Sequence, residues 1–254
     1  MSNFFVFTKK EFVECWRTRK MLVLWLAFAV LGVMSPLFAK LTPEILKLAF
    51  DGELPLAFTE PTSADSWLQF YKNLNQIGIY LIVILFSGIV NREVQNGTLI
   101  PLVTKGLQRT AVILSKYCLM SVQWTLVLGM AFLITWGYTS YYFPDDQSPQ
   151  LLAGLVALWI FGWLLLAVTL LMSTVLRSNY GSLIATILVI VCLYVLNLFE
   201  QVKFLNPLSL MTVNLALVKG EAQLETYLPA LLLSGALTVL LLLAAISSFK
   251  RKKI

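Results

Sequence analysis

The chain has 254 residues, of which 59% are hydrophobic and 13% charged, and its formal net charge is +6. Soluble globular domains are about 45–50% apolar and about 25% charged, so this composition, with a mean hydropathy of +0.81, excludes a water-soluble protein. The basic residues stand at the ends of apolar runs, without the basic stripes and interleaved aromatics of a nucleic-acid interface. The sequence therefore predicts an all-α, polytopic membrane protein that contacts membrane lipids and binds no nucleic acid.

The first twenty residues, 1–20, combine aromatic and basic side chains. Phe5, Phe12 and Trp16 fall close to helical spacing, and Arg17 stands with the lysines around the other side. This pattern favours an amphipathic elbow helix that lies in the lipid headgroup layer. The alternative is a plain basic flank to the first span.

Six apolar stretches are long enough to cross a bilayer, because about 20 helical residues span its hydrocarbon core. We predict transmembrane helices at approximately 21–39, 75–91, 117–138, 151–176, 182–199 and 228–249. The first stretch is longer than the apolar part of a secretory signal and lacks a small-x-small cleavage pattern, which favours an uncleaved span. Residues 41–50 predict a separate short interfacial helix behind it, with Pro43 in its first turn.

The distribution of charge predicts the orientation. The two termini and the connections after the second and fourth spans hold 14 of the 19 Lys and Arg residues but only 3 of the 13 Asp and Glu residues. Cytoplasmic connections carry the basic excess, so we expect both termini in the cytoplasm and the protein in a cell membrane, most simply the bacterial plasma membrane. Three cysteines without a Cys-x-x-Cys pair, and no histidine, predict neither a disulfide nor a metal site.

The interiors of the predicted spans contain no charged residue. Ion-coupled carriers and intramembrane acid–base enzymes usually place ionisable groups there, so neither class is favoured. Polar side chains at membrane depth either form interhelical hydrogen bonds or line a substrate path. The candidates for pathway lining are Gln123, Thr169, Ser173 and Asn197. Gly154 and Gly162 lie near one helical face and predict close helix packing.

The connection after the second span is too long for a simple turn and keeps several apolar residues. Asn96-Gly97 allows a positive φ that ends a helix, and Thr98 can cap a short helix that follows. Glu93 stands beside Arg92 at the start of this basic segment. A short helix with an apolar strip and flanking charges is suited to docking into the groove of a partner.

These features, in this order, resemble the ABC-2 type permease family, the membrane subunits of one class of ABC exporters. The resemblance rests on the six spans, the large first outer loop and a run of motif residues: Lys10-Glu11, Glu93, Gly97-Thr98-Leu99, Arg109 and Lys116. It implies a single transmembrane domain over 1–254, an elbow helix, a coupling helix between the second and third spans, and a dimer with an identical or related permease. It also implies two cytoplasmic ABC ATPase subunits, which would bind ATP and Mg.

The resemblance assigns the coupling to those ATPases to Arg92, Glu93, Gly97, Thr98, Leu99 and Arg109. The chain departs from the family pattern at Gln95 and Asn96, where a further charged residue is common, and at Lys105-Gly106, where a proline is common. The chain has no Gly-x-x-x-x-Gly-Lys-Ser/Thr phosphate loop. We therefore expect it to bind no cofactor and to be no enzyme itself, and to depend on ATP hydrolysed by another subunit.

The function expected first is outward transport, and the apolar walls favour a lipid, peptide or drug-like cargo over a small ion. Two alternatives stay open: an ABC-type membrane sensor or immunity subunit that moves no substrate, and a membrane-embedded enzyme. The absence of histidine and of acids within the predicted spans counts against the enzyme.

Overall fold

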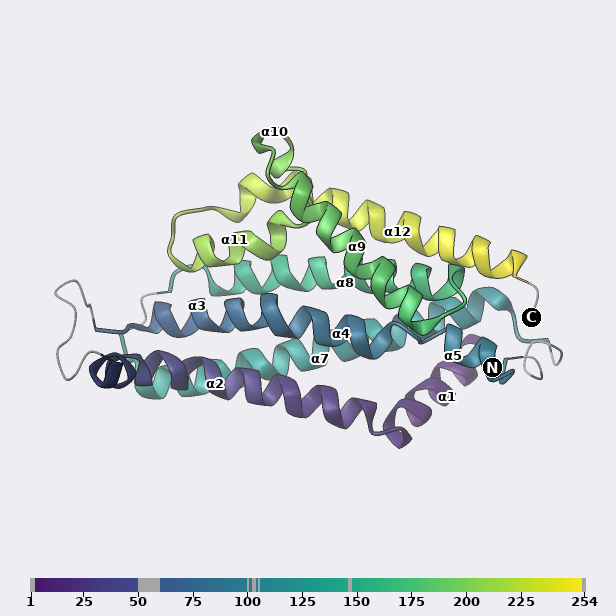
Figure 1. Cartoon of the computed structure of the whole chain (residues 1–254), viewed down its shortest axis with the longest axis horizontal. Coiled ribbons are helices and arrows are strands. Elements are labelled where there is room, and N and C mark those ends of the chain that lie inside the picture. Colours follow the sequence, from purple (N-terminus) through teal and green to yellow (C-terminus); the bar gives the residue numbers. More distant parts are fainter. Residues whose placement is uncertain are drawn as a thin grey trace.

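The computed structural model describes residues 3–49, 60–99, 101, 104, 106–145 and 148–252, which form a bundle of helices along one long axis (Figure 1). The α-helices are α1 Asn3–Arg17, α2 Lys20–Ala49, α3 Ser63–Asn73, α4 Ile79–Phe86, α5 Asn91–Gln95, α7 Arg109–Tyr142, α8 Leu151–Val175, α9 Asn179–Leu196, α10 Glu200–Lys203, α11 Ser209–Val218 and α12 Leu228–Arg251. A π-helical turn, η1 Leu74–Gly78, joins α3 to α4, and a 3-10 turn, η2 Leu224–Tyr227, precedes α12. The all-α prediction is confirmed.

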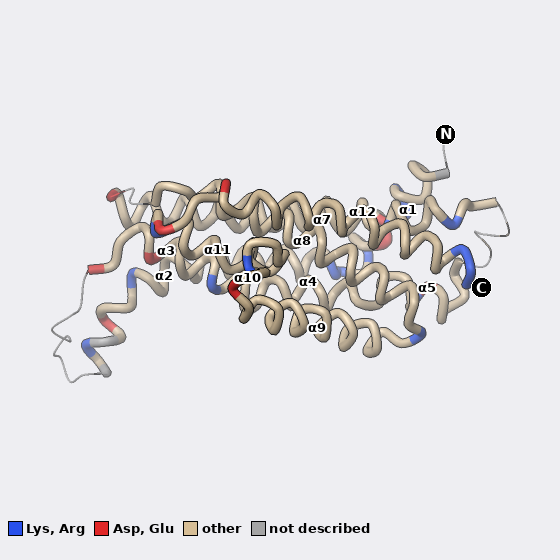
Figure 2. Tube along the Cα trace, turned by 90° about the horizontal axis from the view of Figure 1, so that it is seen from above, with Lys and Arg blue, Asp and Glu red and all other residues tan. Residues whose placement is uncertain are grey.

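Six helical segments are long and apolar enough to cross a membrane, as predicted. They are Lys20–Ile45, Ser63–Gln95, Arg109–Tyr142, Leu151–Val175, Asn179–Leu196 and Leu224–Arg251. Because the number is even, both termini lie at the same end of the bundle, together with α5 (Figure 1). Lys and Arg gather at that end and most Asp and Glu lie towards the other (Figure 2). The assignment of the basic end to the cytoplasm stays a prediction.

Two spans begin well before the predicted positions. The second segment begins at Ser63 rather than near 75, and the third begins at Arg109 rather than near 117. The predicted starts follow the charged residues Lys72 and Lys116, where the mean hydropathy falls. The helical hydrogen bonds, however, continue through these residues. Lys72 and Lys116 therefore lie inside the long helical segments, although both lie outside the predicted apolar stretches, whose interiors contain no charged residue.

The first span is also longer than predicted, and the separate helix over 41–50 is wrong. Helix α2 continues to Ala49 with Pro36 and Pro43 inside it. A proline inside a helix leaves the carbonyl four residues earlier without its donor. For Pro36 that carbonyl belongs to Gly32, and Thr135 of α7 donates its hydroxyl to it at 2.9 Å. A neighbouring helix thus replaces the lost hydrogen bond, as membrane proteins commonly do.

Helix α11 fills much of what the sequence suggested was a plain connection between the last two spans. It is too short to cross a bilayer, but it packs against α8 and α3 with residues such as Leu210 and Leu217 fully buried. Asn75, in the π-helical turn of the second span, donates its amide to the Met211 carbonyl at 2.8 Å and lies 3.3 Å from the side-chain oxygen of Asn214. The π-turn therefore places a polar side chain that fixes α11 on the bundle.

Glycines allow the closest helix contacts, as predicted for α8. A Cβ added at Gly162 would lie 2.2 Å from the indole of Trp124, and one at Gly154 would lie 2.9 Å from the hydroxyl of Tyr71. Trp124 donates its indole N–H to the Trp159 carbonyl at 3.0 Å. These contacts hold α8 against α7 and α3 and form the rigid core on which the ends of the bundle are built.

Candidate functional site

The elbow helix α1 forms at the predicted place and has two distinct faces. Phe5 and Trp16 are 70% and 75% exposed, respectively. Phe12 is half-buried and Arg17 is exposed. Two of the three predicted aromatic side chains are thus exposed, and their contact with the lipid headgroups stays a prediction. The opposite face is buried against the bundle, and its residues were not assigned from the sequence.

The buried face of α1 carries Phe7, Glu11 and Cys15, spaced four residues apart, as one side of a helix requires. Thr8 donates its hydroxyl to that of Ser115 in α7 at 2.9 Å. The elbow helix is therefore attached, through its inward face, to the start of α7.

An ion cluster joins α1 to the rest of the protein, and we call it the elbow cluster. It consists of Lys10, Glu11 and Glu14 of α1, Glu93 of α5 and Lys116 of α7. The ammonium of Lys116 lies 2.9 Å from a carboxylate oxygen of Glu11 and 2.8 Å from one of Glu93. The ammonium of Lys10 lies 2.9 Å from the other oxygen of Glu93. Glu93 is thus shared between two cations from two different helices.

Burial makes this cluster energetically important. The side chains of Lys116 and Glu11 are 1% and 5% exposed. A charge removed from water to this extent is tolerated only when it is paired, and deleting one partner of a buried pair costs about 3–5 kcal/mol. The ring of Phe7 adds to the pairing, with its centroid 5.2 Å from the Lys10 ammonium and 5.8 Å from that of Lys116.

The pKa values in α1 reflect the same surroundings. Burial raises the pKa of the Glu11 carboxyl above its ordinary value, although the positive charge of Lys116 opposes the shift. Burial alone would lower the pKa of Lys10, but its hydrogen bonds to Glu14 and Glu93 raise that pKa above the ordinary range. Lys10 is therefore a permanent cation in this arrangement, and Glu11 accepts a proton more readily than an exposed glutamate would.

A cavity of about 320 Å³ adjoins the elbow cluster, lined by Glu11, Glu14, Glu93, Lys116, Lys20 and Arg92, among other residues. Oxygens of Glu11, Glu14 and Glu93 lie within 4.8 Å of one another, a spacing that suits a hard divalent cation. All three carboxylates, however, lie 2.6–3.2 Å from a lysine ammonium. The lysines already supply the positive charge that a metal would bring, so the arrangement favours an ion-paired structural link.

Helix α5 lies at the centre of this end of the bundle. Ser173 of α8 accepts from the backbone N–H of Val90 at 3.0 Å and of Asn91 at 3.3 Å. Asn91 donates its amide to the Ser182 hydroxyl of α9 at 2.7 Å. Gln95 donates to the Arg177 carbonyl in the turn between α8 and α9. Together with Glu93, these contacts connect one short helix to α1, α7, α8 and α9.

Helix α5 ends in a tight turn at the glycine that the sequence predicted. Gly97 has φ +67°, the left-handed conformation. Its N–H bonds to the Val94 carbonyl at 3.2 Å, and the N–H of Thr98 bonds to the Glu93 carbonyl at 3.1 Å. This pair of bonds is the Schellman motif that closes a helix. Thr98 therefore lies in the turn that ends α5. The residues of the helix that it was predicted to cap lie partly outside the described part of the chain, so that role stays a prediction.

The other residues assigned to coupling have different surroundings. Leu99 is fully buried, so it packs within the chain instead of facing a partner. Ile100, Leu102 and Val103, the rest of the apolar strip, lie outside the described residues. Arg92 is exposed. Arg109 donates to the carbonyls of Phe249, Lys250 and Lys252 at 3.1, 2.8 and 2.8 Å, so it caps the end of α12.

The four candidates for pathway lining all have polar partners inside the bundle. Gln123 accepts from the indole N–H of Trp25 at 3.1 Å, and Thr169 donates to the Leu165 carbonyl at 2.8 Å. Ser173 accepts from the start of α5, and Asn197 accepts from the amide of Asn206 at 3.3 Å. These contacts favour the structural interpretation of the four residues over a polar path through a single chain.

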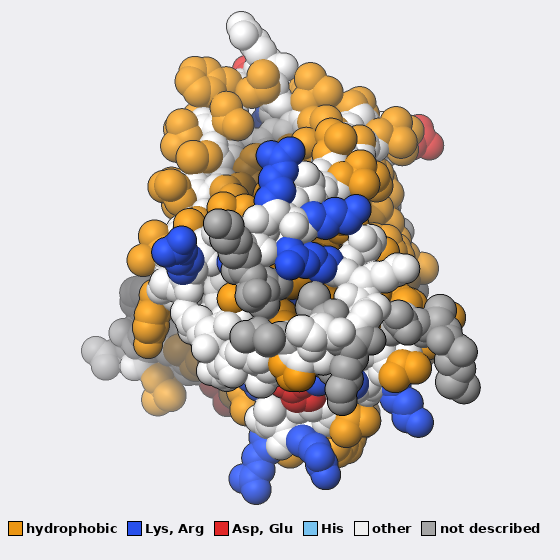
Figure 3. Space-filling model, turned by 90° about the vertical axis from the view of Figure 1, so that its right-hand side faces the viewer, with side chains coloured by type: hydrophobic (Ala, Val, Ile, Leu, Met, Phe, Trp, Pro, Cys, Tyr) orange, Lys and Arg blue, Asp and Glu red, His pale blue; other side chains and the backbone are white. Residues whose placement is uncertain are grey.

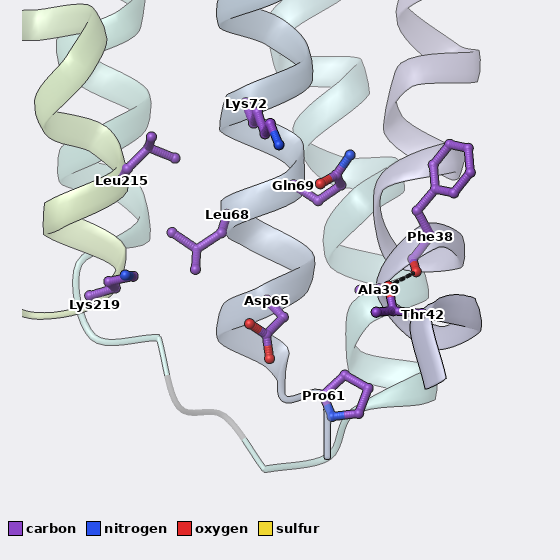
Figure 4. Close-up of a pocket in the computed structure, with 10 residues that line it drawn as sticks. All are labelled: Phe38, Ala39, Thr42, Pro61, Asp65, Leu68, Gln69, Lys72, Leu215 and Lys219. Carbon is purple, nitrogen blue, oxygen red and sulfur yellow. Dashed lines mark hydrogen bonds between the residues drawn. The ribbon is translucent and has the colours of Figure 1, made fainter. Parts of the chain in front are cut away.

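A second polar cavity, of about 520 Å³, lies at the opposite end of the bundle, between α2, α3 and α11 (Figure 4). Lys72 and Gln69 of α3 project into it, and Lys219 approaches from the end of α11 (Figure 4). Asp65 caps the start of α3, where it accepts from the backbone N–H of Thr62 at 2.8 Å. The cavity thus has two lysines on its wall near the end that the charge pattern places outside.

Comparison with known proteins gives a family for this architecture. Residues 45–254 match the family described as protein of unknown function DUF2705. The chain belongs to this family. The uncharacterized transmembrane protein YxlG of Bacillus subtilis (strain 168) is 26% identical over 158 residues, which is 60% of either chain. The present chain thus matches about 60% of that relative's length, and a transmembrane relative agrees with the six apolar helices of a multi-pass membrane protein.

In this DUF2705 member, the matched region contains Glu93 and Lys116 but not α1. Sequence reasoning assigned Glu93 to the site but missed Lys10 and Lys116 as its ion-pair partners, and Glu11 as the second partner of Lys116. A usable signal was present, because the three acids on the basic side of the topology are Glu11, Glu14 and Glu93, and all three meet in the elbow cluster.

Proposed function

We propose that this protein is the membrane permease subunit of an ATP-binding cassette exporter. In this proposal it moves an apolar cargo outward, such as a lipid, peptide or drug-like molecule. It does so as a dimer with an identical or related permease in the cell membrane. Two separate ATPase subunits at the cytoplasmic end bind and hydrolyse ATP with Mg.

The observation that carries the proposal is the ion-paired attachment of the elbow helix to the end of the second span. Glu93 lies between Lys10 of α1 and Lys116 of α7, at 2.9 and 2.8 Å. The Schellman turn at Gly97 follows directly and leads into the segment 98–108. A displacement of that segment would therefore act on several helices at once.

The contacts of α5 suggest how a displacement of the segment 98–108 by the ATPases would change the positions of the helices in the bundle. The short helix is bonded to α1, α7, α8 and α9, so it cannot move without shifting at least one of them. ATP-driven closure of the two ATPases would favour one arrangement of these contacts over another. The protein then needs only a difference in ATPase affinity between its two conformations.

The interior of the single chain bears on where the cargo would pass. The polar residues at depth are bonded to one another and to backbone, and close glycine contacts fill the space between α7 and α8. In the proposed dimer, the path would therefore run between two permeases. The same closed interior also favours the second candidate, a sensor or immunity subunit that moves no cargo.

Co-purification tests the proposal directly. The tagged chain, purified from its native membrane, should retain an ABC ATPase, and ATP hydrolysis should depend on the membrane subunit. Efflux of a fluorescent phospholipid analogue from proteoliposomes then separates a transporter from a sensor. A chain that retains no ATPase under conditions that preserve its fold would rule out both.

A further inference from the structure

A third cavity opens at the same end of the bundle as the termini, on the side of α5 that faces away from the elbow cluster. Its volume is about 760 Å³, within the range typical of ligand sites. It lies between α5, the turn joining α8 to α9, and the end of α12. The lining residues are Asn91, Val94, Gln95, Thr174, Val175, Arg177, Ser248, Arg251 and Lys252.

The walls of this cavity carry positive charge only. Arg177, Arg251 and Lys252 line it, and no acidic residue does. The ion pairs found among the described residues do not include any of these three cations. Burial lowers the pKa of Lys252, and the positive charge of Arg177 lowers it further. Lys252 and Arg177 thus lie close enough to repel each other, and Arg251 lines the same cavity, an arrangement that an anion would stabilise.

The backbone near the cavity does not cancel this positive charge. The carbonyl ends of helices carry partial negative charge and would repel an anion. Here Lys252 donates its ammonium to the Thr174 carbonyl at the end of α8, at 2.7 Å. Arg109 covers the last carbonyls of α12 in the same way. Because other cations already bind these carbonyls, the exposed guanidinium groups of Arg177 and Arg251 are available to bind an anion.

The position of the cavity identifies the kind of anion. Four candidate spans end or begin around it: three end at Gln95, Val175 and Arg251, and one begins at Asn179. The ends of spans lie at the depth of the lipid headgroups. Figure 3 looks onto this end of the molecule and shows Lys and Arg side chains close to hydrophobic side chains that continue along the flank.

Apolar surface leads away from the cavity along the bundle. Helices α9 and α12 both run from the basic end towards the other end of the bundle (Figure 1). Both present exposed apolar side chains, among them Ile184 and Leu188 of α9 and Leu240 and Leu243 of α12. A ligand with acyl chains would keep them in contact with lipid and with these helices while its headgroup reached the cations. A soluble anion would use only the cations.

We propose that this cavity binds the headgroup of an anionic phospholipid, with the phosphate held by Arg177, Arg251 and Lys252. Basic pockets between spans on the cytoplasmic side are suited to acidic headgroups. The side-chain amide of Gln95 and the hydroxyl of Ser248 also line the cavity, where a headgroup such as glycerol would lie. The site does not depend on the exporter function, since any membrane protein with this end in the cytoplasmic leaflet would use it.

The test is a lipid titration of the detergent-purified chain, followed by native mass spectrometry. The probes are dioctanoyl phosphatidylglycerol, dioctanoyl phosphatidylcholine and soluble glycerol phosphate. We expect phosphatidylglycerol to bind tightest. The double variant R177Q/R251Q should weaken its binding about 25-fold, at about fivefold for each cation removed. Both side chains are exposed, so the variant should fold, and R177K/R251K should retain most of the binding.

The matched control is K203Q/K219Q, which removes the same charge from the opposite end of the bundle and should leave phosphatidylglycerol binding unchanged. Three results would overturn the proposal. One is equal phosphatidylglycerol binding by R177Q/R251Q and the parent. Another is binding of glycerol phosphate as tight as that of the lipid, which would indicate a site for a free phosphate. The third is that R177Q/R251Q no longer co-purifies with an ATPase but still binds phosphatidylglycerol, which would assign the basic residues of the cavity to a protein partner.

Discussion

The carboxylate of Glu93 lies 2.8 Å from the ammonium of Lys116, and both side chains are largely buried. The two residues flank the connection between the second and third spans, so their contact closes that connection into a loop with a fixed base. Glu93 reaches Lys10 from the same position, at 2.9 Å. One carboxylate therefore fixes the elbow helix and the base of the loop together.

The variant K116M should destabilise the protein strongly. It leaves the buried carboxylates of Glu11 and Glu93 with Lys10 as their one remaining cation among the described residues, and a broken buried pair costs about 3–5 kcal/mol. E93Q should cost less, because Lys116 keeps its contact with Glu11 at 2.9 Å. Thermal unfolding in detergent, followed by tryptophan fluorescence, measures the difference.

The control for K116M is K203M in α10, where the lysine is exposed. A substitution there should change the free energy of unfolding by no more than about 0.5 kcal/mol. If K116M and K203M unfolded at the same temperature, the elbow cluster would have no role in stability.

The thiol of Cys15 reports whether the elbow helix is docked. It is buried on the inward face of α1, and burial raises its pKa, so little reactive thiolate is present at neutral pH. In a C118S/C192S background, a maleimide should label Cys15 slowly in the parent chain. E11Q weakens the link to Lys116 and should speed labelling several-fold.

A matched variant on the same helix is E14Q. Glu14 is half-exposed and pairs with Lys10 alone among the described residues, so its loss should leave α1 docked and labelling nearly unchanged. Equal labelling rates in E11Q and E14Q would mean that the buried contact does not hold α1.

Gly162 tests the contact between α7 and α8. A methyl group there would lie 2.2 Å from the Trp124 indole, and overpacking of this kind costs about 1–3 kcal/mol. Gly129 in α7 has no neighbouring atom within 4 Å of an added Cβ, so G129A should be neutral or stabilising by up to about 1 kcal/mol. The unfolding temperature should therefore fall for G162A and stay unchanged or rise for G129A, and a similar fall in both would contradict the close packing.

The sequence predicted the six spans and the elbow helix because both depend on local composition. Long apolar runs need no knowledge of their neighbours, and the spacing of Phe5, Phe12 and Trp16 is a property of one helix. The boundaries were less accurate because charged residues such as Lys116 lower the hydropathy without ending the helix. Helix α11 was missed because its burial depends on α8 and α3, which are distant in sequence.

The candidate site shows the same division. The stop at Gly97 could be predicted, since Asn-Gly is a local turn signal. The pairing of Glu93 with Lys10 and Lys116 could not, because it depends on how α1 folds back against α7. Likewise, the bonds from Arg109 to the last carbonyls of α12 could not be predicted, because the two segments are about 140 residues apart in the sequence.

Substitution of Gly97 tests the proposed coupling itself. At φ +67° a side chain costs about 1–2 kcal/mol, most for a β-branched residue and least for asparagine. G97V should therefore disturb the turn that joins α5 to the segment 98–108, while the six spans still insert. In proteoliposomes with the ATPase partner, we expect G97V to hydrolyse ATP but to lose most efflux of a fluorescent phospholipid analogue. G97N, which tolerates the left-handed conformation, should retain both activities. Normal efflux by G97V, at a normal rate of ATP hydrolysis, would show that force does not pass through this turn.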